Sequence, residues 1–154
     1  MNTHANKPTV LCIDDDKNVL SALQRELTRF GCAVRTSLDP TSVKRILTEH
    51  DIDILITDAV MPKMSGIQVL EQAIDASPGT ARIMLTGHCG RADIVIPAVN
   101  RGEIYRLVPK PWEYGELQAA VAESMCLTVA EWESRYVMSK YTVTATAANS
   151  SRAA

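Results

Sequence analysis

Carboxylate side chains follow two of the apolar runs in this sequence. Asp14 and Asp15 come directly after the run at 9–13, and Asp58 comes after the run at 54–56. A carboxylate at the end of a buried strand is costly unless another group binds it, and three carboxylates together would repel one another unless a cation lay among them. Oxygen ligands without cysteine or histidine favour a hard ion, commonly Mg²⁺ where phosphate is handled.

A hydroxyl and an ammonium group, those of Thr86 and Lys110, end two further apolar runs. Donors of this kind stabilise the charge on the equatorial oxygens of a phosphoryl group in transfer. With a metal ion, the set predicts that one carboxylate attacks phosphorus and becomes an aspartyl phosphate. Asp58 is the candidate nucleophile because it stands alone, whereas Asp14 and Asp15 are adjacent and better placed to hold the ion.

Short strand-like runs alternate with helical patterns from residue 9 to about residue 140. The runs predict strands at 9–13, 32–36, 52–57, 81–86 and 103–108. The patterns predict helices at 17–30, 39–50, 65–77 and 91–102, and a last one from near Glu113 to 136 or 140. This alternation predicts an α/β fold with a parallel sheet, because parallel neighbours need crossover connections. Ligands bind outside the carboxyl ends of such strands, so the topology itself would gather the polar residues.

The length of 154 residues and a net charge of −2 suit one domain with a tail and give no basic field for DNA binding. The start of the sequence lacks a signal-peptide core and no apolar segment is long enough to span a bilayer, so a cytoplasmic location is expected. The four cysteines are far apart and indicate neither a zinc site nor disulfides; three of them lie in apolar contexts, where buried thiols are expected. The four are Cys12, Cys32, Cys89 and Cys126.

The motifs "VLCIDDD", "ILITDAVMPKMSG", "IMLTG" and "KPW", in this order and spacing, resemble the receiver domain of two-component response regulators. The resemblance covers about residues 8–126 and implies a doubly wound (βα)5 sheet of flavodoxin-like order 2-1-3-4-5. Residues 1–7 and 141–154 are expected to be disordered, and residues 127–140 to extend the last helix.

The resemblance implies that Asp58 accepts a phosphoryl group from the phosphohistidine of a sensor histidine kinase or phosphotransfer protein. It implies that Mg²⁺ is bound directly by Asp15, Asp58 and the backbone carbonyl of Val60, and by Asp14 mainly through a water molecule. Such a protein is a phosphoacceptor that catalyses its own phosphorylation and slow dephosphorylation, and is not otherwise an enzyme.

In similar proteins the threonine moves toward the phosphoryl oxygens after transfer, and the lysine pairs with them. These roles fall to Thr86 and Lys110, and the Lys110–Pro111 peptide is expected to be cis. The sequence departs from the family at Leu107, where receivers usually carry the aromatic residue of the output switch; Tyr105 is the nearest aromatic side chain.

The expected output is binding to a downstream effector protein, with a homodimer through the fourth helix, fifth strand and fifth helix as a further possibility and no direct DNA or membrane binding. A receiver-like module that binds partners without phosphorylation is the main alternative. A haloacid-dehalogenase-type phosphatase is a weaker one, because "CIDDDKN" fits Asp-x-Asp but has Asn18 where that family needs Thr or Val, and Asp58 would be left unexplained. Two smaller expectations are that Asp16 caps the first helix and that Trp112 anchors the last one.

Overall fold

The computed structural model describes residues 7–87, 104 and 106–125. The strands in these ranges are β1 (Thr9–Ile13), β2 (Ala33–Ser37), β3 (Ile54–Asp58), β4 (Ala81–Thr86) and β5 (Arg106–Pro109). The helices are α1 (Lys17–Arg29), the short 3₁₀ helix η1 (Pro40–Ser42), α2 (Val43–Glu49), α3 (Gly66–Ala76) and α5 (Glu116–Ser124).

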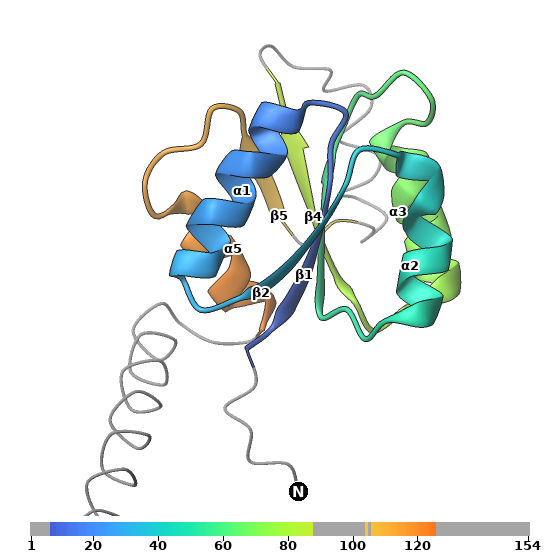
Figure 1. Cartoon of the computed structure of the whole chain (residues 1–154), viewed down its shortest axis with the longest axis horizontal. Helices are drawn as coiled ribbons and strands as arrows, with labels where there is room; N and C mark the ends of the chain where they lie inside the picture. The colour runs from blue at the N-terminus through green and yellow to red at the C-terminus, as the bar shows by residue number, and fades with distance from the viewer. Residues whose placement is uncertain (1–6, 88–103, 105, 126–154) are drawn as a thin grey trace, which may run out of the picture.

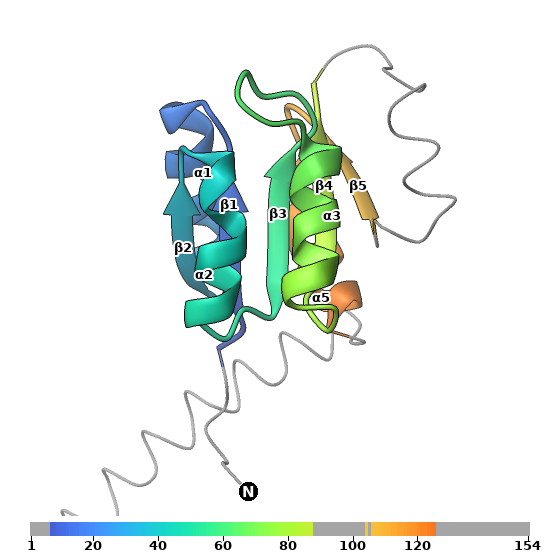
Figure 2. The same ribbon diagram turned by 90° about the vertical axis from the view of Figure 1, so that its right-hand side faces the viewer.

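The strands form one parallel sheet in the order β2-β1-β3-β4-β5. Helices α1 and α5 cover one face of this sheet, and α2 and α3 cover the other (Figure 1). The view in Figure 2 has α2 and α3 in front of the strands. The predicted α/β class and the strand order 2-1-3-4-5 are confirmed.

Each face of the sheet carries its own apolar core because successive side chains of a strand point to opposite faces. Val10 and Cys12 belong to the core under α1 and α5, while Leu11 and Ile13 belong to the core under α2 and α3. All residues of β3 are buried, as expected for the central strand of a doubly covered sheet. The sheet is therefore a rigid base for the residues that follow its strands.

Helices α1 and α3 begin with side-chain caps that the sequence signals. Asp16 accepts a hydrogen bond from the Asn18 amide at 2.8 Å, so the expected cap of α1 is confirmed. Helix α3 starts with a capping box, in which Ser65 and Gln68 each bind the other's backbone N–H. These caps fix the first turns of both helices beside the carboxyl ends of β1 and β3.

The last described helix starts at Glu116, three residues after the start that the sequence predicts, so that boundary was wrong. Gly115 has φ of 89°, a left-handed conformation that interrupts a helix and favours glycine. The amide of Glu113 donates to the Glu116 carboxylate at 2.6 Å instead of entering a helical turn. The residues before Glu116 thus form a turn.

The strands at 9–13 and 81–86 have the predicted bounds, and most other bounds in the described residues shift by one or two residues. The third strand runs to Asp58, which makes the candidate nucleophile its last residue. In the described residues the fifth strand covers Arg106–Pro109, and its edge position agrees with the prolines at its end, since proline cannot donate to a ladder. Cys12 and Cys32 are buried as expected.

Several predictions fall outside the described residues. They are the helix at 91–102, the extension at 127–140, both terminal segments, Tyr105, Cys89 and Cys126.

Candidate functional site

The carboxyl ends of β1 and β3 bring the acidic residues together. These strands are neighbours, with Ile13 opposite Thr57, so Asp14 and Asp58 follow side by side. Carboxylate oxygens of Asp14, Asp15 and Asp58 lie within 4.8 Å of one another. The gathering that the sequence analysis expected from parallel topology is therefore present.

Asp14 is the most deeply buried member of this acidic cluster, with no exposed surface. One carboxylate oxygen accepts from the Asp16 amide at 2.8 Å, and the other accepts from Lys110 Nζ at 2.6 Å. Burial raises the pKa of the Asp14 carboxyl above its usual value, and the nearby Asp58 adds to this, although both hydrogen bonds act in the opposite direction. Asp14 is held in place at a cost in free energy.

Lys110 provides the positive charge of the site. Its Nζ lies 2.6 Å from Asp14 Oδ2 and 3.1 Å from Asp58 Oδ1. Burial alone would lower the pKa of Lys110, but hydrogen bonds and charge interactions with Asp14 and Asp58 raise it above its usual value. The Lys110 backbone N–H donates to the Thr86 carbonyl at 2.6 Å, and the Lys110–Pro111 peptide is cis, as expected.

Asp58 lies at the end of the central strand with 8% of its surface exposed. Its Oδ1 accepts from the Ala59 amide at 2.9 Å as well as contacting Lys110. The Ala59 amide also donates to the Leu85 carbonyl of β4 at 3.0 Å. The backbone on both sides of Asp58 is thus tied into the sheet, which fixes the direction in which its carboxylate points.

Gly66 allows α3 to start directly against the strand end. Its amide donates to the Ala59 carbonyl at 2.9 Å. A Cβ at this position would lie 2.3 Å from the Asp58 carbonyl oxygen and 2.9 Å from Ala59 Cα, closer than real side chains approach backbone. The glycine is visible in the sequence, but the reason for it is visible only in the structure.

The remaining candidate residues are Asp15, a member of the cluster, Thr86 at the end of β4, and Val60 after β3. Asp15 is exposed, next to the buried Asp14. Thr86 ends β4 and stands opposite Pro109 of β5. Val60 lies two residues beyond Asp58 in the loop to α3, with its side chain 55% exposed. The roles assigned above to Thr86 and Val60 stay predictions.

The donor set fits a hard divalent cation. Among the described residues, the cluster offers three carboxylates and no nitrogen or sulfur ligand. Oxygen-only sets of this kind suit Mg²⁺, and the charge of the ion would offset the repulsion among the carboxylates. The acidic cluster is consistent with the magnesium site of a receiver domain.

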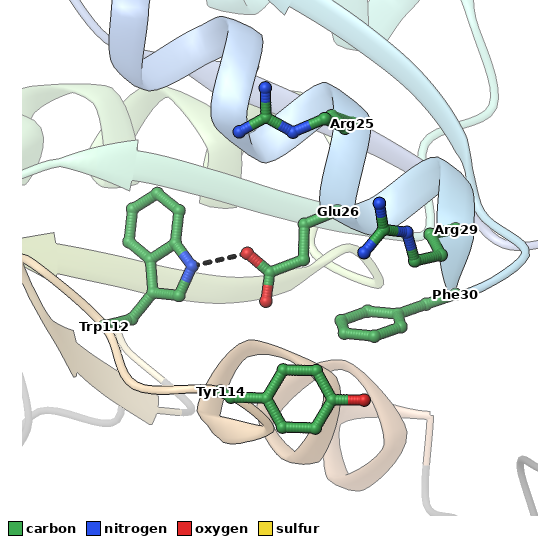
Figure 3. A pocket seen from close by; sticks show the side chains of 6 residues that line it. All are labelled: Arg25, Glu26, Arg29, Phe30, Trp112 and Tyr114. Carbon is green, nitrogen blue, oxygen red and sulfur yellow. Dashed lines mark hydrogen bonds between the residues drawn. The ribbon is translucent and has the colours of Figure 1, made fainter.

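One contact beside the site could not be foreseen from the sequence. Trp112, two residues after Lys110, donates from its indole Nε1 to Glu26 Oε2 of α1 at 2.6 Å (Figure 3). Its ring also packs against the core that contains α5 residues, so the expected anchoring of the last helix is only part of its role. Glu26 carries no local sequence signal, because the partners are 86 residues apart.

Comparison with known proteins decides the family. A family model for the response regulator receiver domain matches residues 10–122, most of the chain. The chain belongs to this family. The pocket formed by Asp14, Asp15 and Asp58 is accordingly of the type found at receiver phosphoacceptor sites.

Two solved structures resemble this receiver domain over nearly their whole length. One is the receiver domain of an HD domain-containing protein from Pseudomonas fluorescens, with 31% identity, a TM-score of 0.72, and coverage of 78% of this chain and 95% of that one. The other is a receiver domain protein from Clostridium thermocellum, with 34% identity, a TM-score of 0.70, and coverage of 76% and 93%.

A curated relative is the transcriptional regulatory protein GlrR of Escherichia coli, which is 29% identical over 122 residues. The match covers 79% of this chain but 27% of GlrR. Across several curated relatives, the chain spans between 21% and 51% of their length. Within the described part of the chain, no helix is both long and apolar enough to cross a membrane.

Proposed function

We propose that this receiver domain is a phosphorylation-controlled switch whose phosphoacceptor is Asp58. The observation that carries the proposal is the pairing of Lys110 Nζ with both Asp14 and Asp58, 2.6 and 3.1 Å away, inside the acidic cluster. In this arrangement a nucleophile, a cation site and a positive charge would lie together at the carboxyl ends of the strands. All three are needed for phosphoryl transfer.

Asp58 would attack the phosphorus of a phosphohistidine on a sensor kinase or phosphotransfer protein. The new bond joins an Asp58 oxygen to phosphorus, and the P–N bond breaks, so the histidine ring leaves with the electron pair and takes up a proton. Asp14, Asp15, Asp58 and the Val60 carbonyl would hold Mg²⁺, which when bound neutralises charge on the attacking and phosphoryl oxygens. Lys110 and Thr86 would donate to the phosphoryl oxygens.

The output of the switch would be binding to a partner protein in the cytoplasm. Leu107 replaces the aromatic residue that usually couples phosphorylation to output in similar proteins, and it is 37% exposed on the edge strand. An exposed aliphatic side chain on β5 suits a protein contact, either with an effector or with a second copy of the chain. The dimer expected through the fourth helix, β5 and α5 would also involve the edge strand β5.

The test is intact mass after incubation with acetyl phosphate and Mg²⁺. The wild type is expected to gain one phosphoryl group, and Asp58→Ala or an excess of EDTA to abolish the gain. Asp75→Ala is the matched control, since it removes an exposed carboxylate from α3 away from the cluster and should be phosphorylated like the wild type.

Phosphorylation of Asp58→Ala to the wild-type level would refute the assignment of the acceptor. A folded wild-type protein that neither gains mass nor forms a complex with beryllofluoride, a phosphoryl mimic, would instead favour the phosphorylation-independent binding module.

A further inference from the structure

A hollow between α1 and the loop from β5 to α5 contains a hydrogen bond that involves no residue of the acidic cluster. Trp112 and Glu26 form this bond, and both side chains are partly buried. Figure 3 shows the Glu26 carboxylate directed at the indole, with the rings of Phe30 and Tyr114 on the other side of the hollow. The hollow has a volume of about 280 Å³ and is lined by Arg25, Glu26, Arg29, Phe30, Trp112 and Tyr114.

We propose that Glu26 and Trp112 act as a clasp that positions Lys110, an inference that rests on the phosphoryl-transfer role proposed for that lysine. Only Pro111 separates Lys110 from Trp112, and its ring fixes one backbone dihedral. The Lys110 amide is bound to the Thr86 carbonyl of β4 at 2.6 Å. The segment is therefore held by the sheet at one end and by α1 at the other.

Helix α1 connects the clasp to the acidic cluster from the other direction. The helix is capped by Asp16, directly after Asp14 and Asp15, and it carries Glu26 further along. The contacts thus close a ring that runs along α1 from the acidic residues to Glu26, across to Trp112, back along the chain to Lys110, and from its Nζ to Asp14 at 2.6 Å. If Trp112 moved away from α1, this closed set of contacts would break, and Lys110 would no longer be held in position from that side.

The hydrogen bond between Trp112 and Glu26, more than the packing of the indole ring, fixes the orientation of Trp112. The Trp112 ring packs against an apolar core, and apolar contact of this kind is non-directional. The indole has a single N–H, and a charged acceptor gives a stronger and more directional bond than a neutral one. Removing the acceptor while keeping the apolar part of residue 26 therefore separates the two contributions.

The test compares Glu26→Met, which has no strong acceptor, with Glu26→Gln, which keeps a carbonyl oxygen at the same reach. Trp112→Phe removes the donor, and Glu49→Met is the matched control because it removes an exposed carboxylate from α2. Two measurements are made on each protein. One is acetylation of Lys110 relative to the exposed Lys44 by peptide mass mapping, without any phosphodonor; the other is the rate of phosphoryl gain at saturating acetyl phosphate.

Glu26→Met and Trp112→Phe are expected to raise relative acetylation of Lys110 roughly fivefold and to slow phosphorylation by a similar factor, as for the net loss of one typical intramolecular hydrogen bond. Glu49→Met is expected to stay within about twofold of the wild type, and Glu26→Gln, which keeps a neutral acceptor, to fall between the wild type and Glu26→Met. Wild-type acetylation of Lys110 in Glu26→Met would overturn the clasp, as would an equal effect of Glu26→Gln. A purely structural role would lower the free energy of unfolding of Glu26→Met without changing Lys110 acetylation, which likewise overturns it.

Failure of the clasp and failure of the proposed function are distinguishable. A wild type that gains no phosphoryl group counts against phosphoryl transfer, whereas the acetylation of Lys110 is measured without a phosphodonor and still decides the clasp.

Discussion

The amino ends of the parallel strands form one border of the sheet, here called the amino edge, and their carboxyl ends form the opposite border, the carboxyl edge. The polar groups of the two edges are paired in different ways. At the amino edge, the Thr9 amide donates to Asp53 Oδ2 at 2.8 Å, and the buried Thr80 hydroxyl donates to the Ile52 carbonyl at 2.7 Å. Each of these donors meets one acceptor from a neighbouring segment. In the described part of the amino edge these two donors are satisfied within the fold, and their hydrogen bonds contribute to stability.

At the carboxyl edge, three carboxylates face one ammonium group. Lys110 contacts Asp14 and Asp58, and Asp15 stands exposed beside them. Repulsion among the carboxylates works against folding, and a bound cation would relieve it. The comparison shows that one edge of this fold contributes to stability, whereas the other carries carboxylate repulsion that a bound cation would offset. The predictions below would break or sharpen this contrast.

The largest effect is expected from Gly66→Ala at the carboxyl edge. The added Cβ would collide with the Asp58 carbonyl, so the free energy of unfolding should fall by roughly 3 kcal/mol and phosphorylation should slow. Urea unfolding and phosphoryl gain measure the two effects. Gly79→Ala at the amino edge is the control, because nothing lies within 4 Å of its added Cβ, and a change of at most about 1 kcal/mol is expected. Equal losses in both variants would contradict the close approach.

Magnesium is expected to stabilise the folded protein by binding at the carboxyl edge. At about a hundredfold excess over its dissociation constant, Mg²⁺ should raise the free energy of unfolding by about 2.7 kcal/mol, because it binds the folded state. Asp15→Asn should reduce this increment, whereas Thr80→Val should leave it unchanged. Thermal unfolding with and without Mg²⁺ measures the increment. An undiminished increment in Asp15→Asn would place the ion elsewhere.

Thr80→Val tests the amino edge. The variant removes the donor to the buried Ile52 carbonyl, and a loss of about 1–2 kcal/mol in the free energy of unfolding is expected with an unchanged rate of phosphorylation. Thr48→Val makes the same substitution where the hydroxyl is exposed on α2, bound to the Lys44 carbonyl, and should cost less. A slower phosphorylation of Thr80→Val would show that the two edges are not independent.

The smallest effect is expected when the pH is raised and the alkylation of the buried thiols of Cys12 and Cys32 is measured. Burial raises the pKa of Cys32 to about 12 and moves that of Cys12 in the same direction. Both thiols should therefore stay protonated and resist alkylation as the pH is raised from about 7 to about 9, since the thiolate is the reactive form. Peptide mapping after iodoacetamide treatment, with and without urea, measures this. Alkylation of the folded chain at the rate of the unfolded chain would show that the core opens readily.

The sequence alone predicted much of the fold because continuous apolar runs mark doubly covered strands. Their polar end residues, Asp14, Asp58, Thr86 and Lys110, could be placed at one edge without knowing any contact, since parallel topology puts all carboxyl ends together. The strand order came from the family resemblance.

Contacts between distant segments could not be predicted in this way. The bond between Glu26 and Trp112 has no local signature in either segment. The late start of α5 depends on the left-handed conformation of Gly115, which the apolar periodicity of the helix does not record. The sequence therefore showed which residues could do chemistry, and the structure showed which neighbours hold them.

The Lys110 contacts have a consequence for electroneutrality. With all four groups ionised, the carboxylates of Asp14, Asp15 and Asp58 and the ammonium of Lys110 leave two net negative charges, which one divalent cation would cancel. Phosphorylation of Asp58 would replace a monoanion by a group carrying nearly two negative charges. A pocket that is neutral before transfer would then hold surplus negative charge, and the field of this surplus would act on every nearby dipole able to turn toward it.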